Sequence, residues 1–264
     1  MVVKNKKKQA RKKAGKSKAV KKPVDIKEAE EEIKQAIAKS IEKETSKSSF
    51  FISTGFKVLD EATGGGFPSP SAIVVEGPPS EYKVPFLIGL AGNAVKKGKK
   101  SVYVCTNDFP ENIIKIGKKI GYDLSGVDFI DSYSWMIGKK SKFPSASALN
   151  PTRLIETFNE ILKKDETECI VLDSLSSLFL YHDKRTVEKF VQMLVALIKD
   201  MNAFLLISVE SGTYSEEMEA TLRYLTDGVI VVEEGKIVVK YIEGVKVNRK
   251  EMRLDFSKKG IEIT

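Results

Sequence analysis

SAIVVEGPPSEYKV, residues 71–84, joins a continuous apolar run to a loop that ends in a lysine. Consecutive apolar residues in SAIVVEG predict a parallel strand that is covered on both faces. A phosphate-binding loop reads glycine, four residues, then glycine, lysine and serine or threonine. Gly77 and Lys83 stand at this spacing, with Tyr82 in place of the second glycine and Val84 in place of the hydroxyl residue. The stretch therefore predicts a strand, a turn of the phosphate-loop type and the start of a helix.

Apolar runs of the same kind recur along the chain and alternate with helix-length segments. The other predicted strands are 100–106, 127–133, 168–173 and 204–210. The predicted helices are 84–97, 110–121, 152–163, 185–201 and 215–225. Repeated β–α–β units predict an α/β fold with a doubly wound, mostly parallel sheet and helices on both faces. After residue 226, the runs around the Glu234-Gly235 turn predict antiparallel edge strands at the C-terminus.

The charge of the chain is divided unevenly. Residues 1–22 carry eleven Lys or Arg and no acidic residue, whereas the rest carries 33 basic and 36 acidic residues. We expect a disordered basic tail over 1–23, because it has almost no large apolar side chains to repay the entropy of ordering. Residues 24–48 predict an amphipathic helix or linker, with one apolar stripe that repeats at three- and four-residue steps. Residues 49–264 form the predicted main domain.

The basic tail suggests one class of partner. Cations on a flexible segment bind the phosphates of DNA or RNA with strong salt dependence and little sequence choice. The tail has no aromatic residue, so base stacking is not expected. A solubilising tail and the high lysine usage of a thermophile are the alternatives. The candidate nucleic-acid contacts are Lys6, Lys7, Lys8, Arg11, Lys12, Lys13, Lys16, Lys18, Lys21 and Lys22.

The cysteines and the lengths of the apolar runs indicate the cellular compartment of the protein. Cys105 and Cys169 each lie inside an apolar run, which favours buried free thiols in a reducing compartment. Metal binding by these two cysteines and His182 is not expected. The sequence has no apolar run of the roughly 18 residues that span a membrane, and we expect a cytoplasmic protein with no membrane partner.

Four further segments resemble a known family. ISTGFKVLDEATGGGFPSPSAIVVEGPP (52–79) resembles the opening of a RecA-superfamily ATPase, and within it the archaeal KaiC-like proteins, kin of the recombinase paralogues. YVCTNDFPENI (103–113) resembles the second strand of that family, FIDSYSW (129–135) the third, and IVLDSLSSL (170–178) the Walker B strand. The resemblance covers about residues 50–264. It implies a RecA-like P-loop NTPase core, ATP and Mg²⁺ as ligands, and homo-oligomers of the ring or filament type.

The resemblance assigns roles to particular residues. The matching phosphate loop is Gly77, Pro78, Pro79, Ser80, Glu81, Tyr82, Lys83 and Val84. Tyr82 is expected to obstruct bound phosphate or force the loop open, because the family glycine permits a close backbone approach. Val84 has no oxygen to bind Mg²⁺. Asp173 matches the acidic residue that holds a Mg²⁺-bound water, or it is a capping carboxylate at a strand end. Asp108 is the candidate for activating water, since Asn107 beside it cannot act as a base.

The eroded loop points to a degenerate Walker A motif and a pseudo-ATPase. Positioning and electrostatics supply nearly all catalysis in phosphoryl transfer, so losses at one site combine. We expect a regulatory or accessory subunit that binds ATP weakly or not at all, hydrolyses it poorly, and assembles with itself or with an active paralogue. A nucleic-acid-associated accessory protein that binds through its tail is one alternative, and an active ATPase is another. Near the C-terminus, the candidates for a basic residue that reaches a neighbouring subunit are Lys240, Lys246, Arg249 and Lys250.

Overall fold

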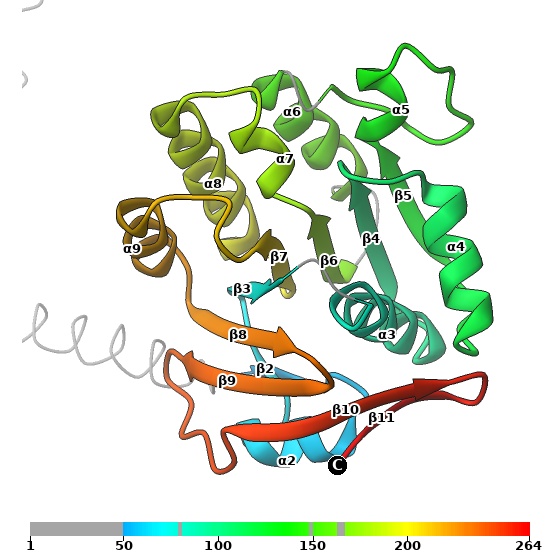
Figure 1. Ribbon diagram of the computed structural model, residues 1–264, viewed down its shortest axis with the longest axis vertical. Helices are drawn as coiled ribbons and strands as arrows, with labels where there is room; N and C mark the ends of the chain where they lie inside the picture. The colour runs from blue at the N-terminus through cyan, green and yellow to red at the C-terminus, as the bar shows by residue number, and fades with distance from the viewer. Residues whose placement is uncertain (1–49, 79–80, 148–149, 163–166) are drawn as a thin grey trace, which may run out of the picture. The chain divides into compact units, whose positions relative to one another are not determined.

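The computed structural model describes residues 50–78, 81–147, 150–162 and 167–264 (Figure 1). The basic tail expected over 1–23 and the amphipathic helix or linker expected over 24–48 lie outside the described residues. Pro79 and Ser80 of the predicted phosphate loop lie outside them too.

The described part of the chain is organised around one large mixed sheet. Its strand order is β11-β10-β9-β8-β3-β7-β6-β4-β5. The strands are β3 (Ser71–Gly77), β4 (Lys100–Cys105), β5 (Val127–Asp131), β6 (Thr167–Asp173), β7 (Phe204–Glu210), β8 (Gly228–Glu233), β9 (Lys236–Ile242), β10 (Glu251–Ser257) and β11 (Gly260–Ile263). This confirms the α/β class and the strand positions that the apolar runs predict.

One strand of the C-terminal region has a different role from the one predicted. Strand β8 pairs parallel with β3 and antiparallel with β9, so it extends the parallel sheet before the direction reverses. Its residues are almost all buried, as in a central strand. Strands β9, β10 and β11 are joined in antiparallel pairs as expected. The turn from β8 to β9 is the predicted Glu234-Gly235, where both residues have positive φ angles.

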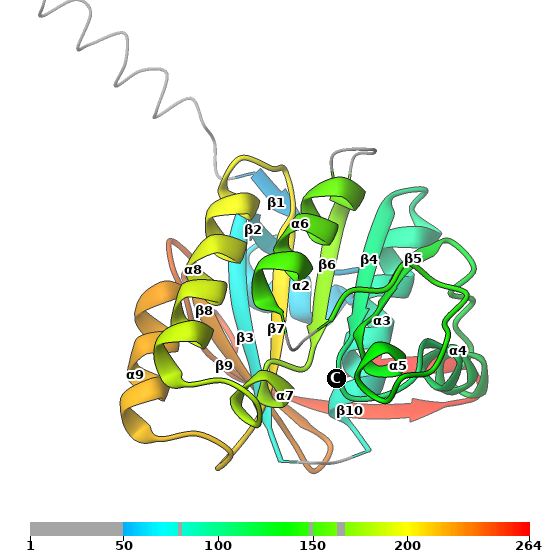
Figure 2. The same cartoon turned by 90° about the horizontal axis from the view of Figure 1, so that it is seen from above.

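Helices cover both faces of the sheet (Figure 2). On one face, α2 (Lys57–Thr63), α3 (Lys83–Lys96) and α4 (Pro110–Lys119) pack into a first apolar core. On the other face, α6 (Pro151–Leu162), α8 (Lys184–Lys199) and α9 (Glu216–Leu225) pack into a second core. Cys105 and Cys169 are buried free thiols in the first core, as the apolar runs around them predict.

The loop that precedes α2 is closed by the side chain of Asp60. Asp60 Oδ1 accepts hydrogen bonds from the Thr54 backbone N at 2.7 Å and from Thr54 Oγ1 at 2.6 Å. Asp60 Oδ2 accepts from Ser53 Oγ at 2.6 Å. Gly66 then lies so close to the Ile52 backbone that an added Cβ would be 2.2 Å from the Ile52 oxygen. The residues that carry the family resemblance at this point thus have a structural role, because they hold α2 to the segment that precedes it.

Several short elements were not predicted from the sequence. Strand β5 ends at Asp131, and the expected strand to residue 133 is wrong, because α5 (Ser132–Met136) begins there. The Asp131 side chain accepts a hydrogen bond from the Ser134 backbone N at 2.9 Å and so caps this helix. The other unpredicted elements are β1 (Phe50–Ile52), β2 (Phe67–Ser69), α2 and α7 (Ser176–Phe179).

Candidate functional site

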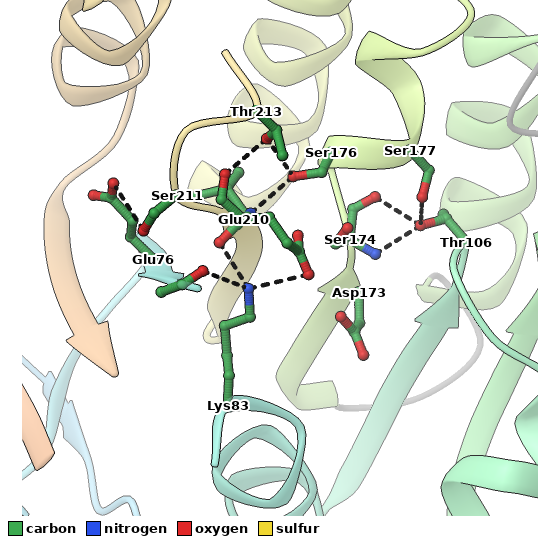
Figure 3. Close-up of polar contacts among 12 residues, drawn as sticks. Glu76, Lys83, Thr106, Asp173, Ser174, Ser176, Ser177, Glu210, Ser211 and Thr213 are labelled. Atoms are coloured by element: carbon green, nitrogen blue, oxygen red, sulfur yellow. Dashed lines mark hydrogen bonds and ion pairs between the residues drawn. The ribbon is translucent and has the colours of Figure 1, made fainter. Parts of the chain in front are cut away.

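A polar cluster lies where four parallel strands end, next to the start of α3 (Figure 3). Lys83 is the first residue of α3, Asp173 is the last residue of β6, and Glu210 is the last residue of β7. Thr106 follows the last residue of β4. In open α/β sheets, ligands bind at the carboxyl ends of the strands, which makes this cluster the candidate site.

The register of the sheet brings Tyr103, Asp173 and Glu210 to one face. Cys105 is paired with Asp173 between β4 and β6, and Tyr103 lies two residues before Cys105 on the same side. Because side chains alternate along a strand, Tyr103 and Asp173 both point toward the face covered by α3. Glu210 is paired with Gly77, the residue that ends β3. Glu210, which is far from Lys83 in the sequence, is thereby placed within reach of the Lys83 side chain.

Lys83 is turned into the protein. Its side chain is only 2% exposed. Lys83 Nζ donates to the Gly77 backbone oxygen at 3.2 Å and to the Val209 backbone oxygen at 2.8 Å. It also forms an ion pair with Glu210 Oε1 at 3.1 Å. An ammonium group has three N–H donors, so these three acceptors match its full capacity.

Asp173 is buried beside this ion pair. Tyr103 Oη donates a hydrogen bond to Asp173 Oδ2 at 2.7 Å. Burial raises the pKa of the Asp173 carboxyl, and the hydrogen bond from Tyr103 lowers it in part. Glu210 raises this pKa further, and Lys83 lowers it. Burial is also the main reason that the pKa of the Tyr103 hydroxyl lies well above its usual value, with the Asp173 charge second.

Hydroxyl groups fix the backbone around the two carboxylates. Thr106 Oγ1 accepts from the Ser174 backbone N and donates to the Ser174 backbone oxygen, both at 2.6 Å. Ser176 Oγ accepts from the Glu210 backbone N at 2.8 Å. Thr213 Oγ1 donates to the Glu210 backbone oxygen at 2.7 Å. The ends of β4, β6 and β7 are therefore cross-linked by side-chain hydrogen bonds.

The other residues of the predicted phosphate loop point elsewhere. The Tyr82 ring packs edge-to-face on Phe256 of β10, with ring centroids 5.5 Å apart. Glu81 and Val84 line a mostly apolar pocket of about 460 Å³ between α3, α4 and β10. An added Cβ at Gly77 would be 2.2 Å from the Val232 backbone oxygen, so the approach of β8 alone requires glycine there. Pro78 is half-buried directly after β3.

The side chain of Asp108, the candidate for water activation, accepts hydrogen bonds from residues at the start of α4. Its Oδ1 accepts from the Phe109 backbone N at 2.7 Å and from Asn112 Nδ2 at 2.8 Å. Asn107 beside it is exposed. The C-terminal basic candidates are all exposed on β9 and the segment before β10: Lys240, Lys246, Arg249 and Lys250.

Glu210, the carboxylate that forms the ion pair with Lys83, was not among the site residues predicted from the sequence. Glu210 ends the predicted strand 204–210, but nothing local to that strand says which cation it meets. Tyr103 was likewise part of an apolar run and carried no polar signal. The one available hint was the position of each residue at or near the carboxyl end of a predicted parallel strand, where ligands and polar groups gather.

Comparisons with known proteins agree with this architecture. The sequence pattern of the family described as "ATPase: KaiC" matches residues 52–264. The chain belongs to the KaiC ATPase family. A KaiC-like protein from the hyperthermophilic archaeon Pyrococcus horikoshii has a similar solved structure, with a TM-score of 0.68 at 15% identity, over 82% of this chain and 99% of that one. This similarity shows the fold, and it confirms the expected RecA-like core.

Curated relatives of this KaiC-family chain are distant. A UPF0273 protein of Pyrococcus horikoshii is 22% identical over 138 residues, which are 49% of this chain and 56% of the relative. The circadian clock oscillator protein KaiC of Synechococcus elongatus is 25% identical over 185 residues, which are 66% of this chain and 35% of the relative. The match therefore spans only about half of the first relative and a third of the second.

Within residues 50–78, 81–147, 150–162 and 167–264, no group of three or more His, Cys, Asp or Glu side chains is placed to hold a metal ion. The same ranges contain no helix that is both long and apolar enough to cross a membrane.

Proposed function

We propose that this KaiC-family protein is a regulatory or accessory subunit with an eroded phosphate loop, which binds ATP weakly or not at all and hydrolyses it poorly. One observation carries the proposal. The lysine at the phosphate-loop position is buried, and its three donors are matched by two backbone carbonyls and the Glu210 carboxylate. A phosphate-loop lysine acts by reaching the terminal phosphates, which this arrangement does not allow without rearrangement.

The residues at the positions that bind Mg²⁺ in a phosphate-loop site support the same proposal. The position that supplies the Mg²⁺-binding hydroxyl in a phosphate loop is Val84, whose side chain packs against the first apolar core. Asp173 accepts a hydrogen bond from Tyr103, and burial favours its neutral form. The residues present therefore do not fit Mg²⁺-ATP in the arrangement described.

Titration with a fluorescent ATP analogue tests the proposal. The full chain, a Lys83→Ala variant and a Lys115→Ala control would be titrated with and without Mg²⁺, and phosphate release from ATP would be followed. Lys115 is an exposed lysine on α4. We expect no saturation below about 1 mM and no phosphate release above background. Micromolar binding that Mg²⁺ strengthens and only Lys83→Ala abolishes would instead identify a working nucleotide site.

A partner protein is part of this proposal. A domain of this family that does not turn over ATP acts through its surfaces, either in assemblies of its own copies or beside an active paralogue. We also propose, as a second function, that the cations of residues 1–22 bind nucleic acid, because the whole basic excess of the chain lies there.

A further inference from the structure

The Glu210 carboxylate stands where an anionic ligand of Lys83 would be. It is the only carboxylate that forms an ion pair with Lys83 in the described part of the chain, with Nζ and Oε1 3.1 Å apart. The Lys83 side chain is 2% exposed and that of Glu210 is 15% exposed. A phosphate that approached Lys83 would meet the negative charge of Glu210 before it found a free donor.

The backbone of Glu210 is fixed by two hydrogen bonds, whereas one oxygen of its carboxylate has no hydrogen-bond partner in the described residues. Its backbone N and O are bound by the hydroxyls of Ser176 and Thr213. Its second carboxylate oxygen, Oε2, is buried and has no hydrogen-bond partner in the described residues. A buried carboxylate oxygen without a partner keeps its desolvation cost, so the carboxylate gains by moving toward water.

The chain after Glu210 has room to let the side chain move. Strand β7 ends at Glu210, and Gly212 follows in an exposed turn with a φ of +80°. Open space surrounds the position where a Gly212 Cβ would lie. Ser211 N donates to the Gly77 backbone oxygen, which is also an acceptor for Lys83 Nζ. The end of β7, the end of β3 and the lysine are thereby connected at one point.

From this geometry we infer that Glu210 is a built-in competitor for polyphosphate anions at Lys83: a diphosphate or triphosphate group binds only by exchange with the Glu210 carboxylate, which must turn away from the ammonium. The inference rests on the proposed function, because it gives the physical cause of weak ATP binding. It places one control of the site in a side chain at the end of β7, outside the phosphate loop itself.

Removing the charge of Glu210 tests the inference. Inorganic pyrophosphate and Mg²⁺-ATP would be titrated by calorimetry into the full chain, Glu210→Gln and Glu168→Gln. Glu168 is a matched control, because it pairs with Lys99 at 2.9 Å and is 13% exposed, at the other end of β6. We expect Glu210→Gln to bind pyrophosphate about tenfold tighter or better, since one competing charge is lost, and Glu168→Gln to bind like the parent.

Two further variants complete the test. Lys83→Ala combined with Glu210→Gln should lose the gain, because the freed lysine is what binds the anion. Glu210→Asp keeps the negative charge but, with a shorter side chain, moves it away from Lys83. We expect this variant to gain part of the increase in pyrophosphate affinity. It replaces Glu210→Gln in the test if that variant does not fold. Unchanged pyrophosphate affinity in a folded Glu210→Gln or Glu210→Asp protein would overturn the inference. Tight ATP binding by the parent chain would instead contradict the proposed function, whatever the variants do.

Discussion

Tyr103 Oη lies 2.7 Å from Asp173 Oδ2, and both groups are buried on the face of the sheet that α3 covers. Tyr103 belongs to β4 and Asp173 to β6, which are neighbours in the sheet. The hydrogen bond supplies Asp173 with a neutral donor. Burial nevertheless raises the pKa of this carboxyl, so the charged form of Asp173 is disfavoured in the folded protein.

This relationship predicts how stability depends on pH. The folded protein holds the Asp173 proton more tightly than the unfolded chain does, so folding stability falls as the pH rises from about 4 through the folded pKa. Asp173→Asn removes this titration and keeps an acceptor for Tyr103. We therefore expect the unfolding free energy of the parent to decrease relative to that of Asp173→Asn as the pH rises toward neutral, in urea unfolding at several pH values.

Asp123→Asn is the control for that series. Hydrogen bonds from Ser125 lower the pKa of Asp123, which is exposed. The parent should then gain stability relative to this variant as the pH rises, which is the opposite sign. A constant difference between the parent and Asp173→Asn at every pH would contradict the assignment of a raised pKa to Asp173.

The Lys83–Glu210 pair should behave as a coupled buried pair. Lys83→Met leaves a largely buried carboxylate without its cation, and we expect a loss of about 3 kcal/mol in unfolding free energy. Adding Glu210→Gln should restore part of it, with a coupling energy of about 1–3 kcal/mol in a double-mutant cycle. The more exposed Lys99–Glu168 pair, at 2.9 Å, should show less than about 1 kcal/mol. Equal coupling in the two cycles would mean that burial does not set the strength of the pair.

Restoring the missing loop residues should improve nucleotide binding. Tyr82→Gly with Val84→Thr supplies the glycine and the hydroxyl of a phosphate loop, and we expect tighter binding of a fluorescent ATP analogue in the presence of Mg²⁺. The variant should also lose stability, because the Tyr82 ring no longer packs on Phe256. Val84→Thr alone is the control that keeps this contact. Unchanged or weaker affinity in both would indicate that the loop has been rebuilt for another purpose.

The basic tail should account for any binding to nucleic acid. Deletion of residues 1–22 removes eleven cations, and we expect retention of DNA or RNA by the full chain at about 150 mM salt to be lost in the deletion. A tail of equal length with its Lys and Arg replaced by Gln separates charge from length. Retention that is unchanged by both variants would exclude the tail as the binding segment.

The α/β class and the positions of the long strands and helices could be predicted from local sequence patterns. These follow from local properties, since continuous apolar runs and three- to four-residue stripes record burial within one element. The turn at Glu234-Gly235 was also readable from two adjacent residues. Short elements such as α5 were missed, because a single capping side chain, Asp131, decided where β5 ends.

The contacts of the phosphate-loop residues depend on how the whole domain folds. The spacing of Gly77 and Lys83 identified the loop, but the partner of Lys83 is Glu210 on a strand far along the chain, brought beside β3 by the order of the sheet. The same order placed Tyr103 against Asp173. Strand order depends on packing across the whole domain and leaves no local pattern in the sequence. The sequence therefore identified Lys83, whereas the fold determined that Glu210 is the carboxylate that pairs with it.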